Sequence, residues 1–320
     1  MKIIKVVIPQ RMKGERLDSA LSELLPNISR SKIAFYIKSG DGLINDQSFK
    51  PNDKACGDEI VNLSINQKKN NNWLAEKIPL DIIFEDEYLI VINKPFGMVT
   101  HPGAGNWNGT LANALLDYDD NLSKLDRAGI VHRIDKNTSG LVVIAKNNQA
   151  HENLSIQFSK HSILRVYQLL IWGKIRPSKG KIETFITRSS KNRQIMEVSK
   201  TKGKKAITNY DTIEIFENKN TPTLSLLECK LETGRTHQIR VHMNYLGNSI
   251  VGDDKYKKKF KKIKNINPLL EKNIVNLNRQ FLHASTIGFF HPKKRKEMIF
   301  NSILPQELEI ILKMLRNTDK

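Results

Sequence analysis

The chain of 320 residues is 39% hydrophobic, enough to bury at least one sizeable core, and its length indicates two domains of which the larger is catalytic. No apolar run approaches the roughly 18–20 residues that span a bilayer, so a membrane span is not expected. Cys56 and Cys229 have no paired spacing, so neither a disulfide framework nor a zinc site is expected, and a reducing cytoplasm is favoured. The formal net charge of +19 predicts a polyanionic partner, because basic charge attracts a phosphate backbone; a lysine- and asparagine-rich surface without a partner is the alternative.

The first 65 residues predict a small α+β domain. The expected elements are a strand at 3–8, helices at 15–25 and 29–40, and strands at 42–45 and 58–62. Leu17 and Leu21 have helical spacing, and Pro26 helps to end the first helix. This order, with Ser-Arg-Ser-Lys opening the second helix, resembles the S4 RNA-binding domain, although the turn at 45–47 lacks the usual Asn-Gly. A generic helical hairpin is the alternative.

A polar segment without periodicity follows, and residues 66–79 are expected to be a linker. A larger domain is predicted from residue 80 to residue 320. Its expected elements are strands at 82–84, 88–92, 141–145, 164–173 and 224–231 and helices at 108–118, 149–158, 236–247 and 305–315. The prolines and glycines of the loop at 93–105 hold a backbone that can approach a substrate closely, unless it is a plain surface loop.

Asp135 is the strongest candidate for a catalytic residue. It lies just before a turn at 137–140 and a buried strand at 141–145, so its carboxylate is expected at the mouth of a sheet, flanked by Arg133 and Lys136. An aspartate among cations is ionised at neutral pH and suits a nucleophile or a base rather than a general acid. The alternative is a structural aspartate that caps the turn or pairs with an arginine.

Two later segments place further polar residues together. On the strand at 164–173, Arg165 and Tyr167 share one face, although this pattern alone favours an ordinary half-buried tyrosine. Thr236 can cap the helix expected at 236–247, on which His237 and Arg240 share a polar face.

Two weaker patterns follow in the same region. His237 and His242 are five residues apart, which is not the spacing of a helical zinc pair. The lysine-rich segment at 253–264 contains Tyr256 and Phe260, and it either contacts phosphates and bases or is a solvated loop.

Four stretches match one family in the right order. The run from Gly129 to Gly140, Gly-Ile-Val-His-Arg-Ile-Asp-Lys-Asn-Thr-Ser-Gly, resembles the signature of the RluA family of RNA pseudouridine synthases. The others are Asn-Lys-Pro with a later His-Pro-Gly at 93–103, Arg-x-Tyr at 165–167 and Gly-Arg-Thr-His-Gln-Ile-Arg-Val-His at 234–242. The resemblance implies a catalytic domain with a mixed, largely antiparallel sheet and a central cleft.

The same resemblance implies roles for individual residues. Asp135 takes the position of the catalytic carboxylate, and Arg240 that of the arginine that pairs with it, expected here to be bidentate. Tyr167 takes the position of the tyrosine that stacks on the target base and can act as a base, and Ile239 would complete the sandwich. Arg133 would insert into the RNA stack when the base is flipped, or bind phosphate. The other expected substrate-binding residues are His132, Arg235 and His237.

Formation of pseudouridine breaks the N1–C1′ bond of uridine, rotates the base and joins C5 to C1′, so no cofactor or metal is expected. Asp135 would act as a nucleophile at C1′ or as a base at the ribose 2′ carbon, and the sequence leaves both open. The expected partner of a monomeric enzyme is large-subunit ribosomal RNA or its precursor particle, with transfer RNA as the alternative. An RNA-binding assembly factor without catalysis and a hydrolytic N-glycosidase, which would need a second carboxylate or an activated water, are the rival functions.

Overall fold

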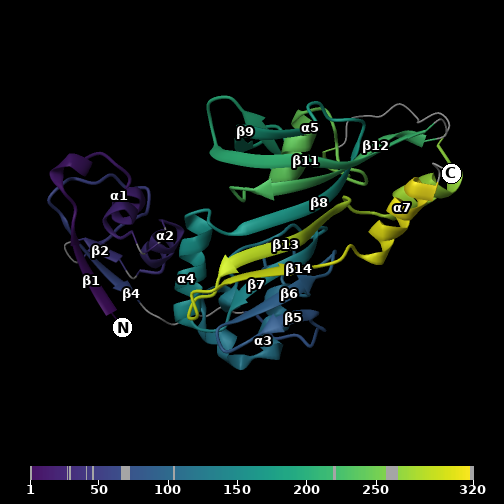
Figure 1. Cartoon of the computed structure of the whole chain (residues 1–320). Coiled ribbons are helices and arrows are strands. Elements are labelled where there is room, and N and C mark those ends of the chain that lie inside the picture. The colour runs from purple at the N-terminus through teal and green to yellow at the C-terminus, as the bar shows by residue number, and fades with distance from the viewer. Residues whose placement is uncertain are drawn as a thin grey trace. The chain divides into compact units, whose positions relative to one another are not determined.

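The computed structural model describes residues 2–26, 28, 30–40, 42–44, 47–65, 73–103, 105–218, 221–256 and 266–317. The chain divides into two compact units, residues 1–70 and 71–320, which differ in colour in Figure 1. Half of the predicted linker, most of the turn at 45–47 and most of the lysine-rich segment lie outside the described residues.

The smaller unit combines an antiparallel sheet with two helices. Its elements are β1 (Lys2–Val7), η1 (Gln10–Met12), α1 (Leu17–Leu24), α2 (Arg30–Lys38), β2 (Gly42–Ile44), β3 (Gln47–Ser48) and β4 (Ile60–Ile65), with strand order β1-β4-β2-β3. The predicted apolar spacing buries Leu17 and Leu21 of α1 against Ile33 of α2. Val61 and Leu63 of β4 complete this core, because alternate residues of a strand point to the same face.

The larger unit is built on one mixed sheet of ten strands among the described residues, in the order β10-β9-β11-β12-β8-β13-β7-β6-β5, with β14 paired to β13. The strands are β5 (Ile82–Glu85), β6 (Leu89–Lys94), β7 (Ser139–Ala145), β8 (Leu164–Trp172), β9 (Lys179–Arg188), β10 (Met196–Ser199), β11 (Lys204–Asn218), β12 (Thr221–Leu231), β13 (Leu282–Phe290) and β14 (Glu297–Asn301). Only the β13–β7 pair is parallel among the described strands, so the sheet is largely antiparallel, as expected.

Strand β7 is an inner strand of this sheet, third from its β5 edge, and it is buried along its whole length (Figure 1). Val142 and Ile144 point into the main core of the unit, whereas Leu141 and Val143 point into a second core that contains Leu154 of helix α4 (Asn148–Ser159). A continuous apolar run is what a strand covered on both faces requires. The sequence prediction of a buried strand at 141–145 is therefore confirmed.

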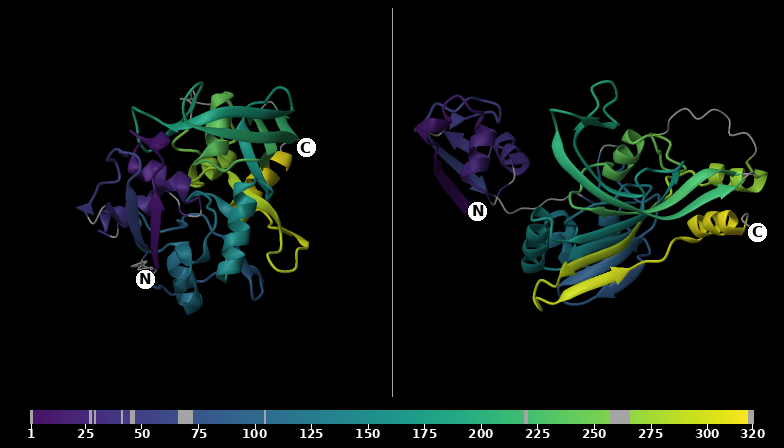
Figure 2. Two further views of the ribbon diagram at one scale, coloured as in Figure 1. Left: turned by 90° about the vertical axis from the view of Figure 1, so that its left-hand side faces the viewer. Right: turned by 45° about the horizontal axis from the view of Figure 1, so that its top comes forward.

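Strands β11 and β12 form a long ribbon. Their pairing shifts register between Thr212 and Glu214 and again between Phe216 and Asn218. Such irregularities bend a strand pair and increase its twist. The long green strands of Figure 2 accordingly curve across the unit.

Helices and short 3₁₀ turns fill the connections of the larger unit. They are α3 (Leu111–Tyr118), η2 (Asp120–Lys124), η3 (Asp126–Gly129), α4 (Asn148–Ser159), α5 (Gln238–Tyr245), α6 (Pro268–Asn276) and α7 (Gln306–Asn317). Helix α3 begins at Leu111, three residues later than predicted, because Thr110 forms a capping box with Asn113.

The prediction that Thr236 caps the helix of residues 236–247 is wrong. Helix α5 begins at Gln238, and the residue before it, His237, has a left-handed backbone (φ 56°, ψ 22°) without a side-chain cap. Gln238 ties the turn instead, because its Oε1 accepts from the Arg235 N–H at 3.0 Å and from the Thr233 hydroxyl at 2.8 Å.

Candidate active site

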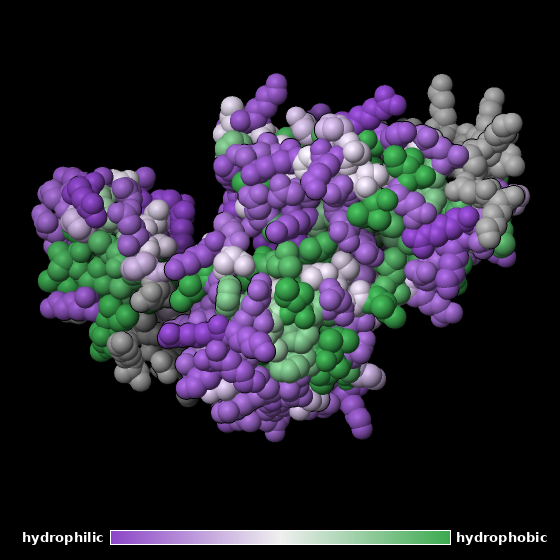
Figure 3. All heavy atoms as spheres, viewed as in Figure 1, coloured by the Kyte–Doolittle hydropathy of each residue, from purple (hydrophilic) through white to green (hydrophobic). Residues whose placement is uncertain are grey.

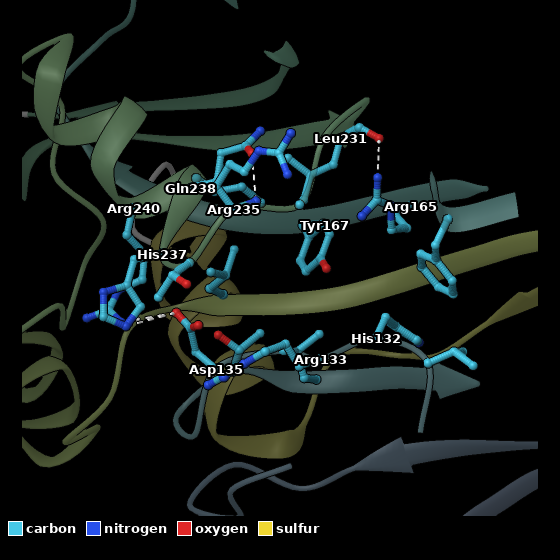
Figure 4. Close-up of a pocket in the computed structure, with 18 of the residues that line it drawn as sticks. His132, Arg133, Asp135, Arg165, Tyr167, Leu231, Arg235, His237, Gln238 and Arg240 are labelled. Carbon is cyan, nitrogen blue, oxygen red and sulfur yellow. Dashed lines mark hydrogen bonds and ion pairs between the residues drawn. The ribbon is translucent and has the colours of Figure 1, made fainter. Parts of the chain in front are cut away.

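All eight residues predicted for the site line one cavity of about 530 Å³ in the larger unit. The loop before β7, strand β8 and the start of α5 supply its walls (Figure 4). The eight residues are His132, Arg133, Asp135, Tyr167, Arg235, His237, Ile239 and Arg240. Segments more than 100 residues apart in the chain therefore meet at one place.

The loop that carries Asp135 is held at its backbone on both sides of that residue. The Thr100 hydroxyl donates to the Ile134 carbonyl at 3.1 Å, and the Gly97 N–H donates to the Lys136 carbonyl at 2.8 Å. Both donors come from the proline- and glycine-rich loop at 93–105. The loop at 93–105 thus fixes the backbone on both sides of Asp135.

Lys94 braces the two loops from inside the protein. Its side chain is fully buried, and its ammonium group donates to the carbonyls of Pro95 at 2.7 Å, Met98 at 2.9 Å and Lys136 at 3.4 Å. Burial lowers the pKa of Lys94 to about 7, against the opposing charge of Asp135. Lys94, the lysine of the Asn-Lys-Pro stretch, therefore holds the loop at 93–105 against the loop that carries Asp135.

Arg240 connects Asp135 to a second carboxylate. Its Nη1 donates to Asp135 Oδ2 at 3.1 Å, while Nε and Nη2 donate to the two oxygens of Asp253 at 2.7 and 2.9 Å. The guanidinium also lies 5.0 Å from the centre of the Tyr256 ring. The expected bidentate pair of Arg240 with Asp135 is therefore wrong, because Asp253 occupies the edge of the guanidinium that can bind a carboxylate with two nitrogens.

The electrostatics of this group keep the arginine charged. Burial alone would lower the pKa of Arg240, but the hydrogen bonds and charges of Asp253 and Asp135 outweigh it and raise that pKa. A permanently charged donor thus faces the Asp135 carboxylate, with its own position fixed by Asp253.

Tyr167 and Ile239 lie on the cavity wall beside Asp135. Tyr167, on β8, is 8% exposed, and Ile239, in the first turn of α5, is 4% exposed. Burial raises the pKa of Tyr167, so the phenol stays protonated at neutral pH. Figure 4 shows its ring facing the open space of the cavity, where a planar group can stack on it.

His132 is held by the protein itself. Its Nε2 accepts the N–H of Val143 at 3.0 Å, and its ring stacks on Phe158 with centres 4.4 Å apart. Burial, with the nearby charge of Arg165, lowers the pKa of His132 to about 3, so the ring is neutral at physiological pH. These contacts fix the position of His132, three residues before Asp135 in the chain.

His237 and Arg235 flank the start of α5. The Nδ1 of His237 lies 2.7 Å from the Tyr256 hydroxyl, and its Nε2 lies 3.9 Å from Asp135 Oδ2. Burial lowers the pKa of His237, although Asp135 opposes this. Arg235 donates from Nε to the Lys205 carbonyl at 2.9 Å and lines the cavity.

Arginines dominate the charge of the cavity. Arg127 and Arg133 are exposed at its edge, and Arg133 makes no hydrogen bond or ion pair among the described residues. Asp135 is the only acidic residue among the described residues that line it. The positive charge of the cavity therefore suits an anionic ligand, and Asp135 supplies the carboxylate that such a ligand would meet there.

Sequence reasoning missed four residues that build the site: Lys94, Arg165, Gln238 and Asp253. Lys94, Arg165 and Gln238 stood inside recognised motifs, which marked their importance but not their contacts. Asp253 was grouped with the lysine-rich segment, and nothing in its spacing from Arg240 indicates the pair.

Within the described ranges no group of three or more histidine, cysteine, aspartate or glutamate side chains could hold a metal ion. Among the same residues no helix has the length and apolar character needed to cross a membrane.

Comparison with known proteins gives close relatives over nearly the whole chain. Residues 88–245 match the family RNA pseudouridylate synthase. The chain is 41% identical to ribosomal large subunit pseudouridine synthase D of Zymomonas mobilis over 97% of each protein. It is 40% identical to the protein of that name from Neisseria meningitidis, over 98% of this chain and 82% of the relative. An uncharacterized RNA pseudouridine synthase of Bacillus subtilis is 37% identical over 99% of each.

Solved structures share the fold. Human RNA pseudouridylate synthase domain containing 4 superposes with a TM-score of 0.57 at 23% identity, covering 73% of this chain and 92% of that one. Human RNA pseudouridylate synthase domain containing 1 gives 0.54 at 22% identity, covering 76% and 96%.

Proposed function

Because the chain belongs to the RNA pseudouridylate synthase family, we propose that it converts uridine to pseudouridine in large-subunit ribosomal RNA, with Asp135 as the catalytic carboxylate. The observation that carries the choice of residue is the 3.1 Å hydrogen bond by which buried Arg240 holds Asp135 at the cavity. Relatives named for the large ribosomal subunit, at about 40% identity over the full length, support the substrate.

The target base leaves the RNA stack and enters the cavity. Unstacking the base costs a few kcal/mol, and contacts with the protein must offset this cost. Tyr167 and Ile239 bind its two faces, and Asp135 meets the ribose. The ionised Oδ atoms serve an attack at C1′ and a proton removal from the 2′ carbon equally well. The raised pKa of Tyr167 supports stacking and hydrogen-bond donation by this residue rather than action as a base.

The arginine-rich lining supports binding of the backbone around the flipped nucleotide. Exposed Arg133 fills the gap in the stack or binds a phosphate, and Arg235, His132 and His237 shape the pocket. Figure 3 shows hydrophilic side chains over most of the visible face, with hydrophobic ones in smaller patches. Such a surface and a net charge of +19 suit an RNA partner.

The proposed division of labour is an S4-like RNA-binding domain at 1–65, a linker at 66–79 and a catalytic domain at 80–320. The antiparallel sheet with two helices supports the first part. RNA recognition favours loops whose bases can be splayed out, and a second domain would widen the footprint beyond one loop.

The central test is Asp135→Asn. We expect it to abolish pseudouridine formation on a large-subunit ribosomal RNA fragment while RNA binding stays within about threefold, because the amide keeps the shape but is neither nucleophile nor base. Asp120→Asn, the same change at an exposed position outside the cavity, is the control. Products are measured as mass-neutral, carbodiimide-reactive nucleotides on ribosomal and transfer RNA.

Each outcome decides among the rivals. Full activity of Asp135→Asn would disprove the assignment of the residue, and release of free uracil would indicate a hydrolytic glycosidase. Conversion of transfer RNA alone would replace the proposed substrate. Binding without any conversion by the wild-type protein would indicate a non-catalytic assembly factor.

A further inference from the structure

Arg165 is a buried cation that the proposed mechanism does not use. It lies on β8, is 8% exposed and lines the cavity. Its Nη2 donates to the carbonyls of Glu232 at 3.1 Å and Leu231 at 3.4 Å, but its Nε is buried without a hydrogen-bond partner among the described residues. It forms no ion pair with any described carboxylate. Its guanidinium carbon also lies 5.7 Å from the centre of the Phe158 ring, but a buried cation without a carboxylate partner is costly unless a ligand compensates it.

Gly234 leaves the space that the guanidinium needs. A Cβ atom built on Gly234 would lie only 2.6 Å from Arg165 Nη1, closer than side-chain atoms tolerate. The backbone of Gly234 does not need the left-handed conformation, so room for Arg165 is the steric reason for glycine here. Gly234 also lines the cavity, which therefore opens onto this nitrogen.

The position of Arg165 relative to Asp135 suggests the ligand. In Figure 4, Tyr167 lies between the two, and Arg165 and Tyr167 leave the same face of β8 two residues apart, which is roughly 7 Å along a strand. A base stacked on Tyr167 with its ribose at Asp135 would therefore direct its far edge towards Arg165. That edge of uracil carries carbonyl oxygens.

We propose that Arg165 binds the carbonyl edge of the target uracil and stabilises the negative charge that the base carries after the N1–C1′ bond is broken. This rests on the proposed function. When that bond breaks, its electron pair stays with the base and spreads to the carbonyl oxygens. Asp135 meanwhile bonds to C1′ or takes the 2′ proton. The pair then forms the C5–C1′ bond, while the ester bond to Asp135 breaks or Asp135 returns the proton to the 2′ carbon. The C5 proton finally leaves and N1 takes up a proton, so the product has the same composition as the substrate.

Burial favours the base over a phosphate as the partner of Arg165. The backbone of a flipped nucleotide stays at the mouth of the cavity, where exposed Arg127 and Arg133 can meet it, whereas the base goes deep. A fixed donor in a site that excludes water stabilises developing charge far more than the same donor in water.

The first experiment measures single-turnover conversion and RNA affinity of Arg165→Met, a change that removes the charge and keeps the length. We expect conversion to fall about 100-fold or more, as for loss of one donor to a developing anion, with the Kd within about threefold. Arg188→Met, an exposed arginine on β9, should match the wild type. A weaker Kd with an unchanged rate would instead indicate a phosphate contact and overturn the proposal.

A second variant keeps the proposal testable if Arg165→Met does not fold. Gly234→Ala keeps the arginine but displaces Nη1, so conversion should fall while the Kd stays within about threefold. Where Arg165→Met folds, the double variant should lose less than the two single losses combined. Additive losses would contradict a shared cause. If the wild-type protein converts no uridine, the proposed function is wrong. If the wild type and both the Arg165→Met and Gly234→Ala variants are fully active, only the role proposed for Arg165 is wrong.

Discussion

Arg240 divides its donors between a catalytic candidate and a carboxylate that only holds it in place. Asp253→Asn should therefore lower kcat about tenfold or more and reduce the free energy of unfolding by about 3 kcal/mol, because a buried arginine loses its closest charge partner. Initial rates and urea unfolding measure the two effects. Asp254→Asn, next in the chain with a side chain 69% exposed and 3.8 Å from Arg240, is the control and should change little. Equal effects of both variants would refute the role of Asp253.

His242 predicts a dependence of stability on pH. It is fully buried between the hydroxyls of Thr184 and Thr208, each 2.9 Å from a ring nitrogen, and burial lowers its pKa to about 4. Because its pKa in the unfolded chain is 6.5, the unfolded state binds the proton first, and stability is lost as the pH falls from 6.5 towards 4. At pH 5 the loss is about 2 kcal/mol. Urea unfolding of His242→Gln should show a smaller drop between pH 7 and pH 5 than the wild type by that amount.

At the scale of elements, the parallel pairing of β7 with β13 depends on a glycine. Gly140 has φ +116°, and a Cβ there would lie 2.3 Å from the Ala284 carbonyl oxygen. Gly140→Ala should therefore lower the free energy of unfolding by about 3 kcal/mol or more, from strain and overpacking together. Gly109→Ala tests strain alone, because φ is +67° with nothing within 4 Å, and should cost about 1 kcal/mol. Similar melting temperatures for the two variants would argue against the close approach.

The sequence predicted several elements whose pattern is strongly apolar, but it missed β13, most of which is buried. Strands β6, β7 and β8 are buried over most of their length and were placed nearly correctly. Strands β9 and β10 were not predicted, because most of their side chains are exposed or half-buried and polar, and β11 was missed as well. Pairing with neighbouring strands makes such segments strands, and the pattern within one segment does not report it.

The site divides in the same way. Motifs placed Asp135 and Arg240 together because both belong to runs with a recognisable family pattern. The pair of Arg240 with Asp253 and the orphan Nε of Arg165 depend on how helix α5 and strand β8 dock, which residue spacing does not encode.

At the scale of the whole chain, the two units predict separable contributions to RNA binding. A protein lacking residues 1–65 should fold, since residues 71–320 contain their own core and the entire cavity. It should bind ribosomal RNA more weakly and with a smaller salt slope, because phosphate contacts are lost, while Asp135 chemistry persists. Titrations at several salt concentrations measure this. An unchanged slope would refute an RNA-binding role for the first unit.

Three hydrogen bonds beneath the Asp135 loop span long stretches of chain: Arg279 to Ser139 at 3.1 Å, Gln280 to Thr138 at 3.0 Å and Ser139 to His283 at 2.9 Å. During translation, β13 is synthesised roughly 7–30 s after β7 at ordinary elongation rates, so β7 cannot pair with it before then. Until then its apolar edge lacks a partner, a state open to aggregation and to chaperone binding. The nascent chain therefore completes its catalytic pocket only after β13 has been made, so a ribosome stalled before Phe290 emerges carries an inactive enzyme.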